Sequence, residues 1–143
     1  MKKILVIACM IFGSAFAASA QGNLATIAQE RATNLSHQMI REFRLNNYQS
    51  RKISEINLFV AQKMLSIEQE YAGNQNKIKE LCDGVCAIRD TKLENILSTE
   101  QYNDYYGSRK ILLALDKEFM ANTAYRGNNN NVASAGATAG NVN

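Results

Sequence analysis

The sequence predicts an all-α protein of four antiparallel helices in an elongated hairpin or cradle arrangement, followed by a disordered C-terminal tail. Between its two ends, the chain repeats apolar residues at spacings of three and four, without sustained strand alternation. It contains no proline, so no residue forces a helix to break. Interruptions in the apolar pattern predict helices at residues 24–44, 47–71, 75–96 and 99–124, and the short connections between them favour antiparallel hairpins.

The first residues of the chain have the pattern of a secretory signal peptide. Lys2 and Lys3 precede an apolar run at residues 4–16, and the small residues at 15–20 offer two alternative cleavage sites. The run is shorter than the roughly 20 residues of a transmembrane helix. We therefore predict a signal peptide at residues 1–20, no membrane span, and a mature protein exported to a bacterial periplasm.

Removal of the signal peptide lowers the net charge. The full chain has 16 Lys plus Arg and 13 Asp plus Glu, and loss of two lysines leaves 14 − 13 = +1. With no recognition motif beside it, this charge argues against nucleic acid as a partner. We expect one helical domain at residues 21–126. The Gly-, Asn- and Ala-rich residues 127–143 are predicted to be disordered, because they offer little apolar surface to bury.

Each predicted helix carries one apolar stripe, which we expect to face the core. The stripe residues are, in chain order, Leu24, Ile27, Ala28, Leu35, Met39, Phe43, Ile53, Ile56, Val60, Met64, Ile67, Tyr71, Ile78, Leu81, Val85, Ile88, Leu93, Ile96, Tyr102, Tyr105, Leu112, Leu113, Phe119 and Met120. Further apolar residues flank these stripes, among them Phe59 and Tyr106. They indicate either an exposed binding face, a partner subunit, or simply a wide core.

Two segments at predicted helix starts share one pattern: leucine, a capping residue, two variable positions, then glutamine. They are Leu45-Asn46-Asn47-Tyr48-Gln49 and Leu97-Ser98-Thr99-Glu100-Gln101. The side chain of Asn46 or Ser98 can accept a hydrogen bond from a backbone N–H of the first turn. Gln49 or Gln101, three residues on, can accept one from the backbone N–H of the cap residue. The pattern therefore predicts two capping boxes.

These paired segments resemble the LTxxQ motif of the Spy/CpxP family of periplasmic stress proteins. The second segment has Ser98 and Thr99 where Leu-Thr-Pro-Glu-Gln is common, and the first has Asn46 where threonine is usual. The resemblance covers roughly residues 25–126 and is carried by the ten motif positions. It implies a cradle-shaped homodimer of helical hairpins. Some family members bind unfolded proteins without ATP, and others act on an envelope-stress sensor.

Cations gather around the first predicted turn. Arg41 and Arg44 suit the dipole at the end of one helix, whereas Arg51 and Lys52 begin the next, where the dipole disfavours positive charge. A charge placed against local stability suggests a use elsewhere, although a solvated helix face explains the asymmetry equally well. The candidate protein-binding residues are Arg41, Arg44, Arg51 and Lys52, with Ile53, Ile56 and Phe59 as apolar partners.

Cys82 and Cys86 are the cysteines that remain after signal-peptide removal, and they are disulfide candidates in an oxidising compartment. On a helix their Cβ atoms lie roughly 5–6 Å apart. A disulfide prefers about 3.8 Å, so a bridge needs a local distortion, which Gly84 eases. A bridge between subunits, free thiols and a redox-active pair are the alternatives. Because His37 is distant in sequence and no further ligand stands out, no zinc site is expected.

No catalytic motif is evident: the chain lacks a Gly-rich phosphate loop, a nucleophile elbow and a Glu-x-x-His pair. We therefore predict a protein without enzymatic activity or cofactor. One functional hypothesis is an ATP-independent periplasmic holding chaperone or envelope-stress protein, homodimeric, that binds unfolded or partner proteins on a basic and apolar helical face. The alternative is a structural or adaptor protein with one fixed envelope partner.

Overall fold

Four helices form the part of the chain that the computed structural model describes, which is the backbone of residues 15–133 and the side chains of residues 22–123. The helices are α1 (Ala15–Glu42), α2 (Asn47–Glu70), α3 (Gln75–Glu94) and α4 (Thr99–Ala133). No strand occurs within these described residues, so the predicted all-α class is confirmed.

Two helices extend further than the apolar pattern predicted. α1 begins at Ala15, inside the predicted signal peptide, and residues 1–14 of that segment lie outside the described residues. α4 continues through Gly127 to Ala133, so the first part of the tail expected to be disordered is helical, while residues 134–143 again lie outside the description. Each added residue contributes a further backbone hydrogen bond, and no proline interrupts either extension. Signal-peptide cleavage stays a prediction.

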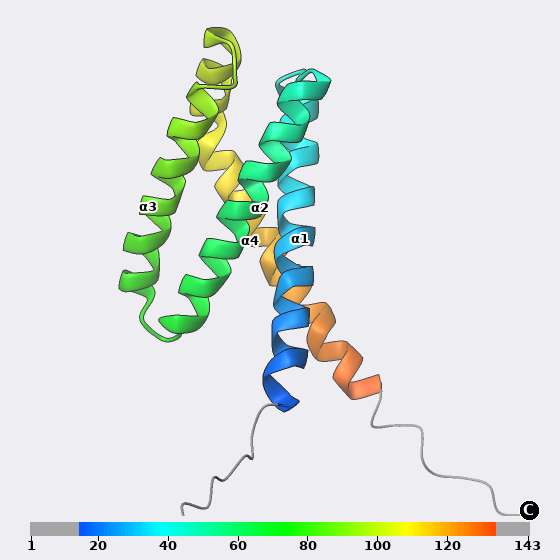
Figure 1. The fold of residues 1–143 in the computed structure, drawn as a ribbon. Coiled ribbons are helices and arrows are strands. Elements are labelled where there is room, and N and C mark those ends of the chain that lie inside the picture. Colours follow the sequence, from blue (N-terminus) through cyan, green and yellow to red (C-terminus); the bar gives the residue numbers. More distant parts are fainter. Residues whose placement is uncertain (1–14, 134–143) are drawn as a thin grey trace, which may run out of the picture.

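The helices reverse direction at every turn (Figure 1). α1 and α2 lie side by side, α3 returns along α2, and α4 starts near the end of α3 and crosses obliquely behind α2 and α1 (Figure 1). α4 contacts both α1 and α3. The cradle-shaped homodimer implied by the family resemblance stays a prediction.

The turn between α1 and α2 is a hydrogen-bonded helix ending. The backbone N–H of Leu45 donates to the carbonyl of Ile40 at 3.1 Å, and Arg44 adopts a positive φ of 50°. This is the Schellman arrangement, in which the residue with positive φ is usually glycine. The Cβ of Arg44 makes that conformation costly by about 1 kcal/mol. The bond to Ile40 directs the chain into the first capping segment.

The core takes residues from the predicted stripes of all four helices, although Ile88 and Leu113, which belong to those stripes, are exposed. Its main cluster consists of Leu35, Met39, Phe43, Ile53, Ile56, Val60, Met64, Val85, Leu93, Leu97, Tyr105 and Leu112. A second cluster between α1 and α2 is built from Ala28, Ala32, Ala61 and Leu65, whose mostly small side chains bring the two helices close together. Among the described residues, no helix carries an apolar stretch long enough to cross a membrane.

Candidate functional site

Both predicted capping boxes are present. The Oδ1 of Asn46 accepts the backbone N–H of Gln49 at 2.9 Å, and the Oε1 of Gln49 accepts the backbone N–H of Asn46 at 3.1 Å. At the start of α4, the Oγ of Ser98 accepts the N–H of Gln101 at 3.2 Å, and the Oε1 of Gln101 accepts the N–H of Ser98 at 3.0 Å. Each pair satisfies two donors that a helix start otherwise leaves unbonded.

The two capping glutamines also bind each other, and we call Gln49 and Gln101 the glutamine clasp. Gln49 Nε2 donates to Gln101 Oε1 at 2.7 Å, and Gln101 Nε2 donates to Gln49 Oε1 at 3.3 Å. The second N–H of each amide reaches a backbone carbonyl of the opposite turn, that of Ile96 or of Phe43, at 3.2 Å in both cases. The repeated motif therefore joins the start of α2 to the start of α4.

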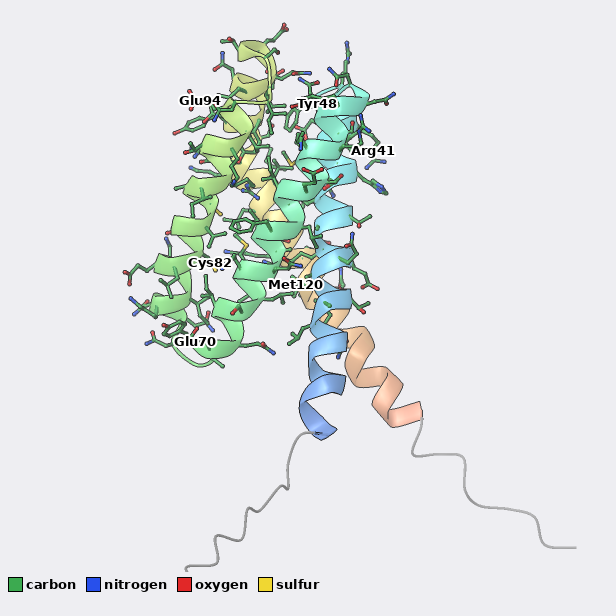
Figure 2. All side chains as sticks on the ribbon, in the orientation of Figure 1. Arg41, Tyr48, Glu70, Cys82, Glu94 and Met120 are labelled. Atoms are coloured by element: carbon green, nitrogen blue, oxygen red, sulfur yellow. The ribbon has the colours of Figure 1, made fainter. Side chains whose placement is uncertain are left out.

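The predicted basic turn lies at the end of the molecule where α1 meets α2, beside Tyr48 (Figure 2). Arg41, Arg44 and Arg51 are exposed there. Lys52 is half-buried, and its Nζ lies 2.9 Å from the carboxylate of Glu55 one turn along the helix. Its charge is therefore partly offset within α2.

The predicted apolar partners of this turn do not share one surface. Ile53 is fully buried and Ile56 is 8% exposed, and both belong to the main core cluster. This placement is incompatible with their proposed role as exposed binding residues, because the neighbouring helices cover both side chains. Phe59 alone is exposed, at 37%.

Phe59 lies between two lysines from different helices. The Nζ of Lys63, on α2, is 5.8 Å from the ring centroid, and the Nζ of Lys92, on α3, is 5.7 Å from it. Ile88 lies one turn before Lys92 on the same side of α3 and is 47% exposed, although its stripe predicted a core position. We call Phe59, Lys63, Ile88 and Lys92 the Phe59 face.

A buried ion pair connects three helices inside the bundle. The guanidinium of Arg31 on α1 donates to both carboxylate oxygens of Asp116 on α4, at 2.8 and 2.7 Å, and lies 3.3 Å from Glu68 on α2. Burial by itself lowers the pKa of Arg31, but the hydrogen bonds and charges of Asp116 and Glu68 outweigh it, so the pKa is raised. The guanidinium stays charged and holds α4 against α1.

A second polar cluster surrounds the buried phenol of Tyr105. The Tyr105 hydroxyl donates to Asp90 and accepts a hydrogen bond from Arg89 Nε at 3.1 Å. Asp90 also accepts from Arg109 at 2.7 Å, and the Arg109 guanidinium lies 3.4 Å from the ring centroid of Tyr106. Burial is the main cause of the raised pKa of Tyr105. This cluster joins α3 to α4.

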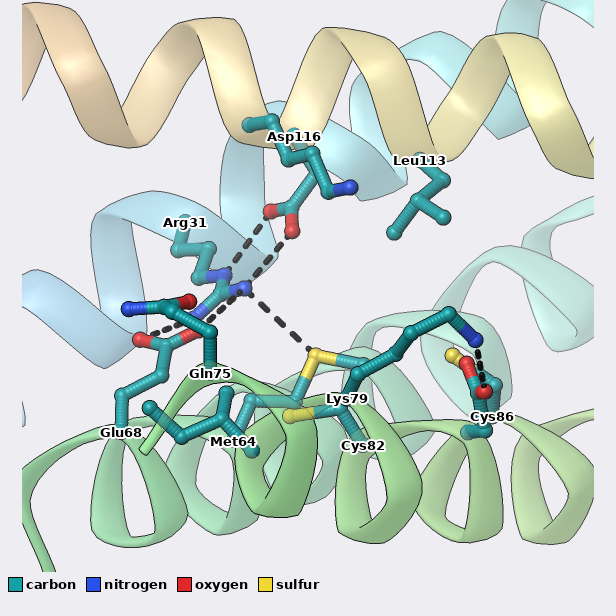
Figure 3. A pocket seen from close by; sticks show the side chains of 12 residues that line it. Arg31, Met64, Glu68, Gln75, Lys79, Cys82, Cys86, Leu113 and Asp116 are labelled. Atoms are coloured by element: carbon teal, nitrogen blue, oxygen red, sulfur yellow. Dashed lines mark hydrogen bonds and ion pairs between the residues drawn. The ribbon is translucent and has the colours of Figure 1, made fainter. Parts of the chain in front are cut away.

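A cavity of about 240 Å³ separates α3 from α4 beside the Arg31–Asp116 pair (Figure 3). Cys82 and Cys86 of α3 and Met64 of α2 are among the residues that line it. Both cysteines are free thiols, and α3 runs unbroken through Gly84, so the predicted intrahelical disulfide is absent from this structure. Burial raises the pKa of both thiols.

Within the described residues, no group of three or more His, Cys, Asp or Glu side chains is placed to hold a metal ion. His37 is exposed on α1, away from the cavity between α3 and α4.

Sequence reasoning missed the Phe59 face and the buried ion pair. The spacing of four residues from Phe59 to Lys63, and from Ile88 to Lys92, was a usable signal for a mixed apolar and basic surface. Arg31 stood inside an apolar stripe, which marks a buried charge that needs a partner. Nothing in the sequence identified that partner as Asp116.

The family to which the chain belongs is defined without a function. The model of a domain of unknown function (DUF4890) matches residues 17–105, which is more than half of the chain. The matched segment contains both capping boxes, the two cysteines and the Phe59 face, and it ends at Tyr105. No curated protein and no solved structure matches the chain.

Proposed function

We propose that this chain, a member of the DUF4890 family, is a non-enzymatic, ATP-independent holding chaperone or envelope-stress protein that binds unfolded or partner proteins. We further propose that it acts in the periplasm as a homodimer, after removal of its signal peptide. The observation that carries the binding proposal is the Phe59 face, where an exposed aromatic ring lies between two lysines.

The chemistry of the Phe59 face suits loosely specified protein partners. An aromatic ring and the aliphatic Ile88 offer apolar contact without fixed hydrogen-bond geometry, so many sequences can pack against them. Lys63 and Lys92 attract acidic segments and raise the rate of encounter at low salt. Their aliphatic stems also extend the apolar area around the ring.

The face differs from the turn that sequence analysis favoured. The turn has exposed cations, but two of its three predicted apolar partners, Ile53 and Ile56, are buried in the core. The Phe59 face brings both components together across α2 and α3. We therefore propose the Phe59 face as the binding surface, with the cations of the turn as a second, separate basic region.

The proposal is tested by light scattering of several unrelated proteins as they aggregate, with and without the mature protein and in the absence of ATP. We expect the parent protein to suppress aggregation of more than one of them. Phe59→Ala should weaken suppression. Ile111→Ala is the matched control, because Ile111 is an apolar residue 61% exposed on α4.

A second pair of variants separates the two basic regions at equal change in charge. Lys63→Gln with Lys92→Gln should weaken suppression, and more strongly at low salt, because screening weakens exposed charges. Arg41→Gln with Arg44→Gln should retain most of it. The opposite ranking would move the site to the turn. Suppression of no aggregating protein would refute the chaperone proposal.

The adaptor alternative predicts a different outcome of the same experiment. A protein with one fixed partner should leave the aggregation of unrelated proteins unchanged and yet bind a single envelope protein through the Phe59 face. Phe59→Ala would then abolish that one interaction.

A further inference from the structure

We propose that Cys82, Cys86 and Met64 form a binding site for a soft monovalent metal ion of the Cu(I) type, in the cavity between α3 and α4. The three sulfur-bearing side chains line one cavity of about 240 Å³ and come from two helices (Figure 3). Thiolate and thioether sulfur are the ligands that favour Cu(I) over harder cations.

The spacing of the two cysteines suits a bridging metal better than a disulfide. They lie one turn apart on the unbroken helix α3, where Cβ atoms are roughly 5–6 Å apart. A disulfide needs that separation to shrink to about 3.8 Å. A metal ion with metal–sulfur bonds of about 2.3 Å can join sulfurs as far as about 4.6 Å apart. Two thiolates can therefore take up the ion while α3 stays helical.

Met64 supplies a third sulfur from the neighbouring helix. It is buried on α2, and its Sδ accepts a contact from Arg31 Nη2 at 3.5 Å, at the wall of the cavity. The same guanidinium donates through Nε and Nη2 to the two carboxylate oxygens of Asp116, and these shorter bonds hold it in place beside Met64. The thioether is thus positioned by packing and faces the space beside the cysteines.

The charges around the cavity favour a low-coordinate soft ion over zinc. Glu68 and Asp116 are occupied by Arg31, and Asp83 is paired with Lys79. These carboxylates are therefore engaged, and two thiolates with one thioether fall short of the four ligands of a structural zinc site. On binding, each thiol loses one proton and forms one metal–sulfur bond, so two protons leave for every Cu(I) bound and no electron is transferred.

The bound site would carry one net negative charge, two thiolates against one Cu(I). Arg89 is placed to offset it, because its Nη2 lies 3.9 Å from Cys86 Sγ. Lys79 lies at the rim of the same cavity.

The test is an anaerobic titration of the reduced mature protein with Cu(I) against a chromophoric Cu(I) chelator. We expect one Cu(I) per chain and two released protons. Cys82→Ser and Cys86→Ser should each raise the Kd more than tenfold, since losing a ligand costs at least as much as losing an outer partner, about 10–100-fold. Met64→Leu should weaken binding less. Met120→Leu, a methionine outside this cavity, is the control and should leave binding unchanged.

A measurement on the parent protein guards against variants that do not fold. One equivalent of Ag(I), a redox-inert probe with the same preference for sulfur, should protect both cysteines from alkylation. Gly84→Ala should bind Cu(I) as well as the parent, because a Cβ at Gly84 meets no atom within 4 Å. No binding by the parent, or undiminished binding by the folded Cys82→Ser and Cys86→Ser variants, would overturn the proposal. Tighter binding of Zn(II) than of Cu(I) would overturn the assignment of the ion.

Discussion

Replacing Gln101 with alanine tests how much the glutamine clasp contributes to stability. The substitution removes two hydrogen bonds to Gln49, one to the carbonyl of Phe43 and one to the backbone N–H of Ser98. At about 1 kcal/mol net for each bond, and with some of the released groups regaining water, we expect the free energy of unfolding to fall by about 2–3 kcal/mol. Ser98→Ala removes only the local cap and should cost about 1 kcal/mol.

The clasp can be separated from the two capping boxes by a double-mutant cycle. Gln49→Ala and Gln101→Ala each remove the same two shared bonds, so the double variant should lose about 1–2 kcal/mol less than the sum of the single losses. The measurement is urea unfolding followed by far-UV circular dichroism, with equal m values as the control that the unfolded states are comparable. If the two losses add to within about 0.5 kcal/mol, the glutamines act only as local caps and the reasoning is refuted.

Four further predictions concern single features of the fold. Asp116→Asn should lower the free energy of unfolding by about 3 kcal/mol in a urea titration, because it leaves a buried guanidinium with a weakened partner; a loss under 1 kcal/mol would contradict this. Because burial raises the pKa of Tyr105, the phenol ionises more readily in the unfolded chain. The stabilisation that comes from burying the neutral phenol is therefore fully present below about pH 10 and is lost as the pH rises further. The urea midpoint of the parent protein should fall over this pH range, and that of Tyr105→Phe should fall less. Arg44→Gly should stabilise the protein by about 1 kcal/mol, because glycine adopts the positive φ of this turn without strain; an unchanged or lower midpoint would show that the arginine is not strained. Arg51→Glu with Lys52→Glu should keep or slightly raise the melting temperature, since acidic residues suit the start of α2, and a clear drop in calorimetry would argue against the dipole account.

The local parts of this structure could be predicted from the sequence because their causes lie within a few residues. The period of the apolar residues predicted four helices, and residues three positions apart predicted both capping boxes. The predicted starts of α2, α3 and α4 match the structure, because each starts at a capping residue or directly after a turn. The outer ends of α1 and α4 were predicted poorly, because both helices continue beyond the apolar pattern that was used to place them, and no proline stops either one.

Which side chains become buried between helices depends on the crossing angle and the rotation of each helix, and neither can be read from the apolar pattern. A stripe shows which residues share one side of a helix, but the width of the buried strip depends on the neighbour. Packing within the main core cluster therefore buries Ile56, while Phe59, less than one turn further along α2, stays exposed. Ile88 was predicted to lie in the core and is exposed for the same reason, because none of the described helices covers its side of α3.

The sequence by itself determined the helical class, the turns and the two capping boxes, because periodicity and capping act over three or four positions. Only the tertiary structure decided that Gln49 meets Gln101, 52 residues away, and that Arg31 meets Asp116, 85 residues away. Such pairs form only when several helices pack together. The free energy that brings the two residues into contact comes from the packing of those whole helices, so the two residues alone do not identify each other in the sequence. The tertiary structure likewise gathered Phe59 with Lys92, and Met64 with the two cysteines, from separate helices.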